Sequence, residues 1–445
     1  MKRIGLVPLV MAFAMPGQAN DFFGDVDTTA SAPVAPSGPV QFLGWAQHKT
    51  AFGYRAPASG FSRDEAALTR FESTLYGQVT GRWGDVSVRA AGSLAHDWLP
   101  DVADAGLWSA YEFTTAQANA RRWQGFWDDS YVRWQPGDLW LTAGYQTFAW
   151  GEAESLTVTD VLAPRDQRWP GQADLETVRL PVPALHMTWR DALELVVLDA
   201  TAADRLAGPF DEFDALAELR ASGASLSTQT PSQRVGLAAR WQQRWSGLDV
   251  QVMAASLNAY TPTVRSVTFG GSGPEQVVLR PEALTVVGAG AQWVLGSWLW
   301  RTEQAWHQGV HLPTEQALAP WESVDEWRSM VGAEYSGWSN LTVSAELGTM
   351  RITRNGAAVD ADAWRWSQSL RTRWTGWNER LTLTAQTVNL PGNDGLLGRL
   401  DAEWKPSDPL TVGVSLVEYH AWDEEQMLHP ARHNDAITLN LRLGF

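Results

Sequence analysis

The chain has 445 residues, a formal net charge of −16 and no cysteine. All-β barrels run long as single units, so this length does not require several domains. The lack of cysteine excludes disulfides and thiolate metal sites, and the acidity argues against nucleic acid as a partner. The 26 tryptophans exceed what an acidic soluble protein would carry, and aromatic side chains suit membrane interfaces.

The N-terminus reads as a signal peptide over residues 1–19. Lys2 and Arg3 precede an apolar run over residues 4–15, and small residues lead to a cut after Ala19. Residues 20–39 are rich in Asp, Ala, Ser and Pro, which predicts a flexible periplasmic leader; a small plug inside a barrel is the alternative. No later stretch offers the ~18 uninterrupted apolar residues of a membrane helix.

The C-terminal segment NDAITLNLRLGF alternates apolar and polar residues and ends on Phe445. This period of two predicts a strand with one apolar face, which a soluble sandwich could also contain. Together with the signal peptide and the excess of tryptophan, it favours an outer-membrane barrel. The ending resembles the C-terminal signature of bacterial outer-membrane proteins, which implies that Phe445 is an assembly signal for the barrel-assembly machinery.

Tight turns flanked by tryptophan or tyrosine recur along the chain. Each joins two alternating segments through Gly, Pro, Asn or Asp, as periplasmic turns beside an aromatic girdle do. They are GRWGDVSV, VRWQPGDLWL, MTWRDALEL, ARWQQRWSGLDVQV, QWVLGSWLW, YSGWSNLTV, RWTGWNERLTL and AEWKPSDPLTV. With a first and a last strand added, residues 40–445 predict an all-β, transmembrane antiparallel barrel of about 18 strands, with short periplasmic turns and long extracellular loops.

The face opposite the apolar residues should line the lumen, and arginines outnumber acids on it. The predicted lumen arginines are Arg70, Arg82, Arg89, Arg133, Arg190, Arg234, Arg240, Arg244, Arg301, Arg328, Arg365, Arg371, Arg373, Arg399 and Arg442. The predicted lumen acids are Glu72, Asp129, Glu194, Glu303, Glu326, Glu334, Glu346, Asp401 and Glu403. A cationic wall would favour solutes that carry carboxylate, sulfate or phosphate, whereas the alternative is that these charges pair across strands.

The segment GPFDEFDALAELRASG, within a loop over residues 199–232, reads as a short amphipathic helix. Pro209 suits its first turn, Phe210, Phe213 and Leu216 would share a face, and Gly223 can end it. It would pack on the barrel rim or act as a lid over the mouth.

The segment from Trp150 to about Val178 would be the third extracellular loop. In general porins a third loop commonly folds inward, so we expect a constriction there, and closely spaced Asp and Arg can cross-link such a loop. The candidate residues are Trp150, Glu152, Asp160, Arg165, Asp166, Arg168, Glu176 and Arg179.

The same segment resembles a known family. Gly144-Tyr145-Gln146, Trp150-Gly151-Glu152, the run from Thr157 to Leu162, Pro164 and Asp166, then Asp174-Leu175-Glu176 and Arg179-Leu180-Pro181-Val182 look like the signature of the outer-membrane proteins catalogued as domain of unknown function 1302. Tyr145 stands where the family usually has Arg, which would remove a lumen charge, and Ala163 where it usually has Asn, a turn cap. The resemblance implies a porin-like barrel for the passage of hydrophobic or amphipathic compounds.

Catalysis and metal binding are not expected. No nucleophile-elbow serine or HExxH pattern occurs, and the spaced pairs His307 with His311 and His429 with His433 should fall at strand ends or in loops. We therefore predict no enzyme and no cofactor. The transport alternatives are a selective conduit for amphipathic anions, a general diffusion porin, or an outer-membrane partner of an envelope export system with an inner-membrane pump or a periplasmic lipid carrier.

Overall fold

The computed structural model describes residues 40–55, 67–104, 113–173, 178–208, 211–231, 233–270, 273–314, 321–354, 359 and 362–445. The predicted signal peptide and leader lie outside these ranges. Among the described residues, no helix is long and apolar enough to cross a membrane.

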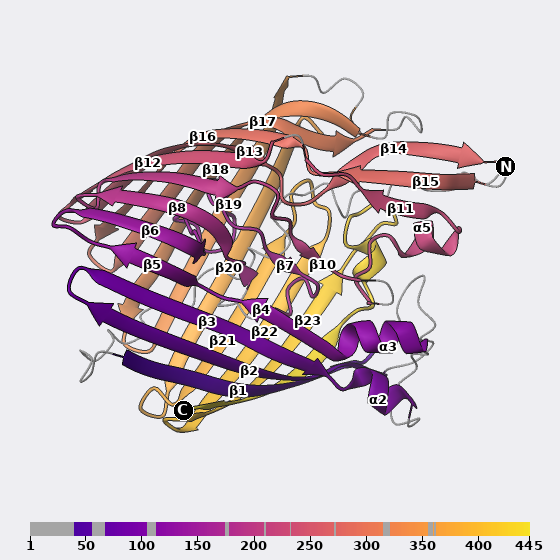
Figure 1. The fold of residues 1–445 in the computed structure, drawn as a ribbon, viewed down its shortest axis with the longest axis horizontal. Helices are drawn as coiled ribbons and strands as arrows, with labels where there is room; N and C mark the ends of the chain where they lie inside the picture. The colour runs from indigo at the N-terminus through magenta and orange to yellow at the C-terminus, as the bar shows by residue number, and fades with distance from the viewer. Residues whose placement is uncertain are drawn as a thin grey trace.

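The described chain forms a closed antiparallel barrel of 18 strands, which confirms the predicted fold class (Figure 1). Neighbouring strands pair in chain order, and β4 and β5 both pair with β3 as two parts of one interrupted strand. The barrel strands are β1 (Val40–Gly53), β2 (Ala67–Trp83), β3 (Val86–Asp97), β4 (Trp123–Trp127), β5 (Ser130–Trp134), β6 (Leu139–Gln146), β8 (Val182–Trp189), β9 (Leu193–Asp199), β12 (Val235–Trp245), β13 (Leu248–Asn258), β16 (Ala283–Leu295), β17 (Trp298–Pro313), β18 (Trp321–Trp338), β19 (Leu341–Arg354), β20 (Trp364–Gly376), β21 (Leu381–Asn389), β22 (Leu396–Ser407), β23 (Leu410–His420) and β24 (Ala436–Gly444).

The first and last strands close the barrel. β1 and β24 pair from Trp45↔Gly444 to Gly53↔Ala436, so no sheet edge remains between the two ends of the described chain. Phe445 extends this pairing, because its amide donates to the Gly44 carbonyl and its carbonyl accepts from the Gly44 amide, both at 2.9 Å. The Phe445 ring lies against Gly44, where an added Cβ would come within 2.5 Å of it.

All predicted tight turns lie at one end of the barrel, shown on the left of Figure 1. Backbone with positive φ forms several of them, such as Gly84 at 60° and the pair Arg190 and Asp191 at 53° and 51°. Short turns mark the periplasmic end of an outer-membrane barrel. The helices and the β14–β15 hairpin lie at the other end, which we therefore take as extracellular.

The outer face of the barrel is apolar and carries a belt of aromatic side chains at the periplasmic end. One exposed tryptophan stands beside every tight turn: Trp83, Trp134, Trp189, Trp245, Trp298, Trp338, Trp377 and Trp404. In β24 the exposed positions are Ile437, Leu439, Leu441 and Leu443, as the alternation predicts. Aromatic side chains are favoured at the boundary between lipid hydrocarbon and headgroups. This preference explains why a tryptophan accompanies each tight turn in the sequence.

The extracellular end carries the remaining elements. They are α2 (Leu99–Asp104), α3 (Thr115–Arg122), β7 (Asp166–Gln167), β10 (Arg205–Leu206), α5 (Ala217–Ala221), β11 (Ser225–Thr228), β14 (Thr263–Gly270), β15 (Gly273–Arg280) and the 3₁₀ turn η2 (His429–Ala431). β11, β14 and β15 form a separate three-stranded sheet, and β7 pairs in parallel with β10.

The amphipathic helix predicted from Pro209 is shorter than expected. Helical structure covers only Ala217–Ala221 and ends before Gly223, which has a φ of 84°. Its apolar residues do not share one face: Leu216 packs with Val264 and Leu279 of the β14–β15 hairpin, whereas Phe213 lies 5.4 Å from the ring of Tyr419 in β23. Pro209 and Phe210 lie outside the described residues.

The inside of the barrel is not an open space throughout. A single apolar cluster joins the third loop, through Phe148, Trp150 and Leu162, to inward-facing residues of β8, β9, β12, β13 and β16–β18, and of β21–β23. Strand residues of this cluster lie toward the extracellular ends, as with Leu312 and Val388. Apolar packing therefore fills much of the extracellular half of the lumen.

Candidate functional site: a loop docked inside the barrel

Residues 147–181 form the third long connection of the chain, between β6 and β8, and leave the wall inward. Trp150 is 2% exposed and Leu162 is fully buried. Gly144, just before the exit, has a φ of 135°, and a Cβ there would come within 2.3 Å of the Ser130 carbonyl oxygen. Only glycine fits this close approach of two strands.

Tyr145 does not face the lumen, which corrects the expectation that an arginine at this position would add a lumen charge. Its ring is on the lipid face of β6, where it stacks on Trp127 of β4 with centroids 6.3 Å apart. The residues on either side, Gly144 and Gln146, point inward instead, because side chains alternate along a strand.

Glu303 of β17 holds the loop from the opposite wall. Its Oε1 accepts hydrogen bonds from the amides of Glu152 and Ala153, and its Oε2 accepts from the amides of Val158 and Thr159 and from the Thr159 hydroxyl. Glu303 is fully buried. A loop without secondary structure leaves its amides without partners, and one carboxylate here satisfies four of them.

Glu346 of β19 holds the part of the loop between those two contacts. It accepts from the amides of Glu154, Ser155 and Leu156 at 2.7–2.9 Å. Gln386 of β21 adds a hydrogen bond to the Ser155 hydroxyl at 2.7 Å. The segment 152–159 is therefore fixed to three strands of the far wall.

Asp160 is the centre of the ion pairs within the loop. Its Oδ2 lies 3.2 Å from Arg165 and 2.8 Å from Arg179, and its Oδ1 accepts from the Trp150 amide. Burial alone would raise the pKa of Asp160, but the two arginines outweigh it and lower that pKa below its ordinary value. Both ends of the loop are thus tied to one ionised carboxylate.

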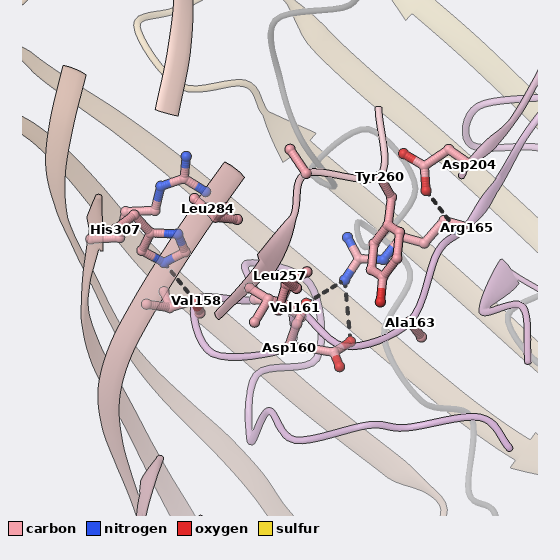
Figure 2. Close-up of a pocket in the computed structure, with 13 residues that line it drawn as sticks. Val158, Asp160, Val161, Ala163, Arg165, Asp204, Leu257, Tyr260, Leu284 and His307 are labelled. Atoms are coloured by element: carbon pink, nitrogen blue, oxygen red, sulfur yellow. Dashed lines mark hydrogen bonds and ion pairs between the residues drawn. The ribbon is translucent and has the colours of Figure 1, made fainter. Parts of the chain in front are cut away.

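Figure 2 shows the small cavity next to this ion pair. It measures about 50 Å³ and lies between the loop and β13, β16, β17 and β18. The Tyr260 hydroxyl donates to the Leu162 carbonyl at 2.6 Å, and His307 Nε2 donates to the Val158 carbonyl at 3.0 Å. The cavity has room for a water molecule or two rather than for a solute.

Asp166 forms the second ion-pair centre, nearer the extracellular side. It pairs with Arg168 at 2.6 Å and with Arg205 of β10 at 3.1 Å. Trp169 lies between two guanidinium groups, with Arg168 and Arg70 at 4.4 and 3.9 Å from its ring. The loop also reaches β22, where Arg399 donates to the carbonyls of Gly171 and Ala173.

Of the predicted loop residues, Trp150, Glu152, Asp160, Arg165, Asp166, Arg168 and Arg179 therefore lie together inside the barrel. Glu152 accepts from Gln251 of β13 at 3.1 Å. Glu176 lies outside the described residues.

Of the fifteen predicted lumen arginines, seven form ion pairs with carboxylates of the wall or of the third loop. Arg70 pairs with Glu72, Arg240 with Glu194, Arg301 with Glu154 and Glu334, Arg328 and Arg365 with Glu326, Arg371 with Glu154, and Arg399 with Asp401. The alternative was that these charges pair across strands, and the structure shows pairs across strands, within one strand and with the third loop.

Other predicted arginines differ from this group. Arg89 donates to the Tyr76 hydroxyl at 3.4 Å, and Arg133 donates to the Thr142 hydroxyl at 3.1 Å. Arg234 is exposed just before β12, and Arg190 lies in a periplasmic turn, 3.4 Å from Asp138, rather than on the wall. Among the described residues, Arg89 and Arg133 thus form no ion pair with a carboxylate, and both lie toward the periplasmic end.

His307 and His311 lie within β17, which corrects their expected place at strand ends or in loops. They are separated by a bulge at Gly309, where the register with β18 shifts. Among the described residues, no three His, Asp or Glu side chains come together as metal ligands would.

The comparison with protein families agrees with this geometry. The model of the family described as "Protein of unknown function (DUF1302)" matches residues 227–445. The family resemblance is confirmed. The match to DUF1302 includes β12 to β24, whereas the motif that suggested the family lies before it. No curated protein matches the chain.

Solved structures share the fold of this chain. OccAB3 of Acinetobacter baumannii has a TM-score of 0.53 at 10% identity, over 91% of this chain and 99% of that one. OccK8 (OprE) of Pseudomonas aeruginosa has a TM-score of 0.52 at 8% identity, over 91% and 97%. At such identities the likeness extends to the fold, which is that of outer-membrane porins and supports an outer-membrane location.

Sequence reasoning missed how the third loop is anchored. Glu303 and Glu346 were expected only as lumen acids, and Gln251 and Gln386 were not singled out. Their inward position follows from strand alternation, but nothing local in the sequence indicates that a segment 99 to 231 residues away supplies their partners.

Proposed function

We propose that the protein is a selective outer-membrane conduit for small amphipathic anions rather than a general diffusion porin. The observation that carries the proposal is the docked third loop. Its segment 152–159 crosses the lumen to Glu303 and Glu346, and its apolar side chains join the core that occupies much of the extracellular half. A wide aqueous pore is incompatible with that packing, so passage depends on fit to what remains.

Two features support amphipathic anions as the solutes. Val161 and Trp169 of the loop are only partly buried, and their apolar side chains suit the body of such a molecule. In the periplasmic half, Arg89 and Arg133 form no ion pair with a described carboxylate, and guanidinium binds carboxylate, sulfate and phosphate groups well. The expectations that the chain has no enzymatic activity and that an export pump or lipid carrier is a partner stay predictions.

Liposome swelling and planar-bilayer recordings test the proposal. We expect slow entry of neutral sugars without grading by size, and a reversal potential in a KCl gradient that reports anion preference. Rapid, size-graded entry of many sugars would favour the general porin, and clear cation selectivity would overturn the proposed solute class.

A further inference from the structure

A second cavity, outside the docked loop, lies at the periplasmic end of the lumen. It measures about 220 Å³ and is bounded by β5, β6, β8, β9 and β12, beside the turns at 135–138 and 190–192. Its lining consists of Arg133, Trp140, Thr142, His186, Thr188, Asp191, Glu194, Gln242 and Arg244. The cavity therefore combines an aromatic wall, neutral hydrogen-bonding groups and two guanidinium groups.

Arg133 is held in place without a carboxylate. Its Nε donates to the Thr142 hydroxyl at 3.1 Å, and its guanidinium carbon lies 5.0 Å from the Tyr131 ring and 5.1 Å from the Trp140 ring. No ion pair joins it to any described acid. Because Nε of Arg133 bonds to Thr142 and the two rings hold the guanidinium plane in place, the two terminal nitrogens can donate to a ligand.

Arg244 faces the same cavity and also forms no ion pair with a described residue. Its register partner in β13 is Asp249, whose Oδ2 accepts instead from Gln292 at 3.3 Å. The two acids in the lining do not neutralise the charges of both Arg133 and Arg244. Glu194 is already paired with Arg240 and His186, at 2.6 and 3.1 Å, and Asp191 lies in the turn.

We propose that this cavity is a periplasm-facing binding site for a small carboxylate with an aromatic body. Arg133 and Arg244 would hold the carboxylate, Trp140 would contact the ring, and the hydroxyls of Thr142 and Thr188 line the space between. A cavity of about 220 Å³ is smaller than a typical drug-sized site, which limits the ligand to a single ring with a short acidic group. The inference rests on the proposed function, since it names where that conduit recognises its solute.

Benzoate is a suitable probe, with benzyl alcohol as its neutral analogue and acetate as its analogue without a ring. We expect benzoate added on the periplasmic side of a planar bilayer to reduce the KCl current in a saturable manner. Benzyl alcohol and acetate should act at much higher concentration. Arg133→Gln should weaken half-saturation by about tenfold to a hundredfold, since it removes a charge-assisted pair, and Arg133→Lys should lie between.

Arg190→Gln is the matched control, because it removes the same charge at the same end of the barrel from a turn residue that does not line the cavity. Equal half-saturation in the Arg133→Gln and wild-type proteins would overturn the site. If the wild-type protein still prefers anions in the KCl gradient, that result leaves the proposed conduit standing. A wild-type protein without anion preference would refute the conduit itself. Heat-dependent electrophoretic mobility of each variant shows that it has folded.

Discussion

Replacing Glu303 with glutamine should release the third loop from the far wall. Both oxygens of the Glu303 carboxylate accept hydrogen bonds. In glutamine one of these oxygens is replaced by an NH2 group, which is a donor and faces the donor amides of the loop. At least two of the amides at 152, 153, 158 and 159 then lose their acceptor. A buried donor left unsatisfied costs about 1–3 kcal/mol, so docking should weaken by about 2–6 kcal/mol.

The lack of cysteine in the natural chain makes this release measurable. Ala163 is a small loop residue, 5% exposed, that does not contact Glu303 through any hydrogen bond. In an Ala163→Cys background, we expect Glu303→Gln to raise the labelling rate with a membrane-impermeant maleimide about thirtyfold or more, since each 1.4 kcal/mol is tenfold. Mean conductance or its fluctuation should rise in parallel.

Glu403→Gln provides the control for this experiment. Glu403 is a lumen-side carboxylate of β22 that pairs with Lys405 at 3.1 Å, close to the periplasmic turn after β22, and it makes no hydrogen bond to the described part of the loop. It should leave labelling unchanged. If a folded Glu303→Gln barrel labels at the wild-type rate, the carboxylate does not hold the loop and the reasoning fails.

Two further predictions concern assembly and pH. Gly144→Val should abolish refolding, because its Cβ would meet the Ser130 carbonyl oxygen at 2.3 Å. Gly398→Ala is the control and should refold normally, because no atom lies within 4 Å of the added Cβ. Heat-modifiable electrophoretic mobility measures both yields, and equal yields would contradict the close approach at Gly144. The lowered pKa of Asp160 implies a tether that is complete above about pH 3.9, the ordinary value, and weakens as pH falls through the folded-state pKa. Ala163→Cys exposure, read with a pH-tolerant thiol reagent, should rise as the pH falls below about 3.9. Asp160→Asn should raise it already at neutral pH, and no such rise would contradict the role of the ion pairs.

The barrel was predictable because its signals are local. A strand shows its lipid face by alternation, and a periplasmic turn shows itself by Gly or Asn beside a tryptophan such as Trp83 or Trp338. These features need no knowledge of distant residues. The same rule placed Glu303 and Glu346 on the lumen side correctly.

The loop anchors were not predictable because they are set by the closed fold. Glu303 meets the loop only when β17 stands across the lumen from β6, and alternation gives a side chain its face but not its partner. Tyr145 shows the converse. Its motif predicted a lumen position beside the third loop, but the residue still belongs to β6, and alternation along that strand turns it toward lipid. The helix expected over Pro209 to Gly223 failed for a related reason, since Phe213 and Leu216 pack against different tertiary partners.

The two anchors should act as one unit, because their contacts alternate along the loop. Glu303 holds residues 152–153 and 158–159, and Glu346 holds the residues 154–156 between them. Releasing the middle strains the outer contacts, so the free-energy changes of Glu303→Gln and Glu346→Gln should not add. We expect an interaction energy of about 0.5–3 kcal/mol in a double-mutant cycle read by Ala163→Cys labelling. Additivity within about 0.5 kcal/mol would instead mean that the two parts of the loop dock independently, and release of one would then leave the other half of the constriction in place.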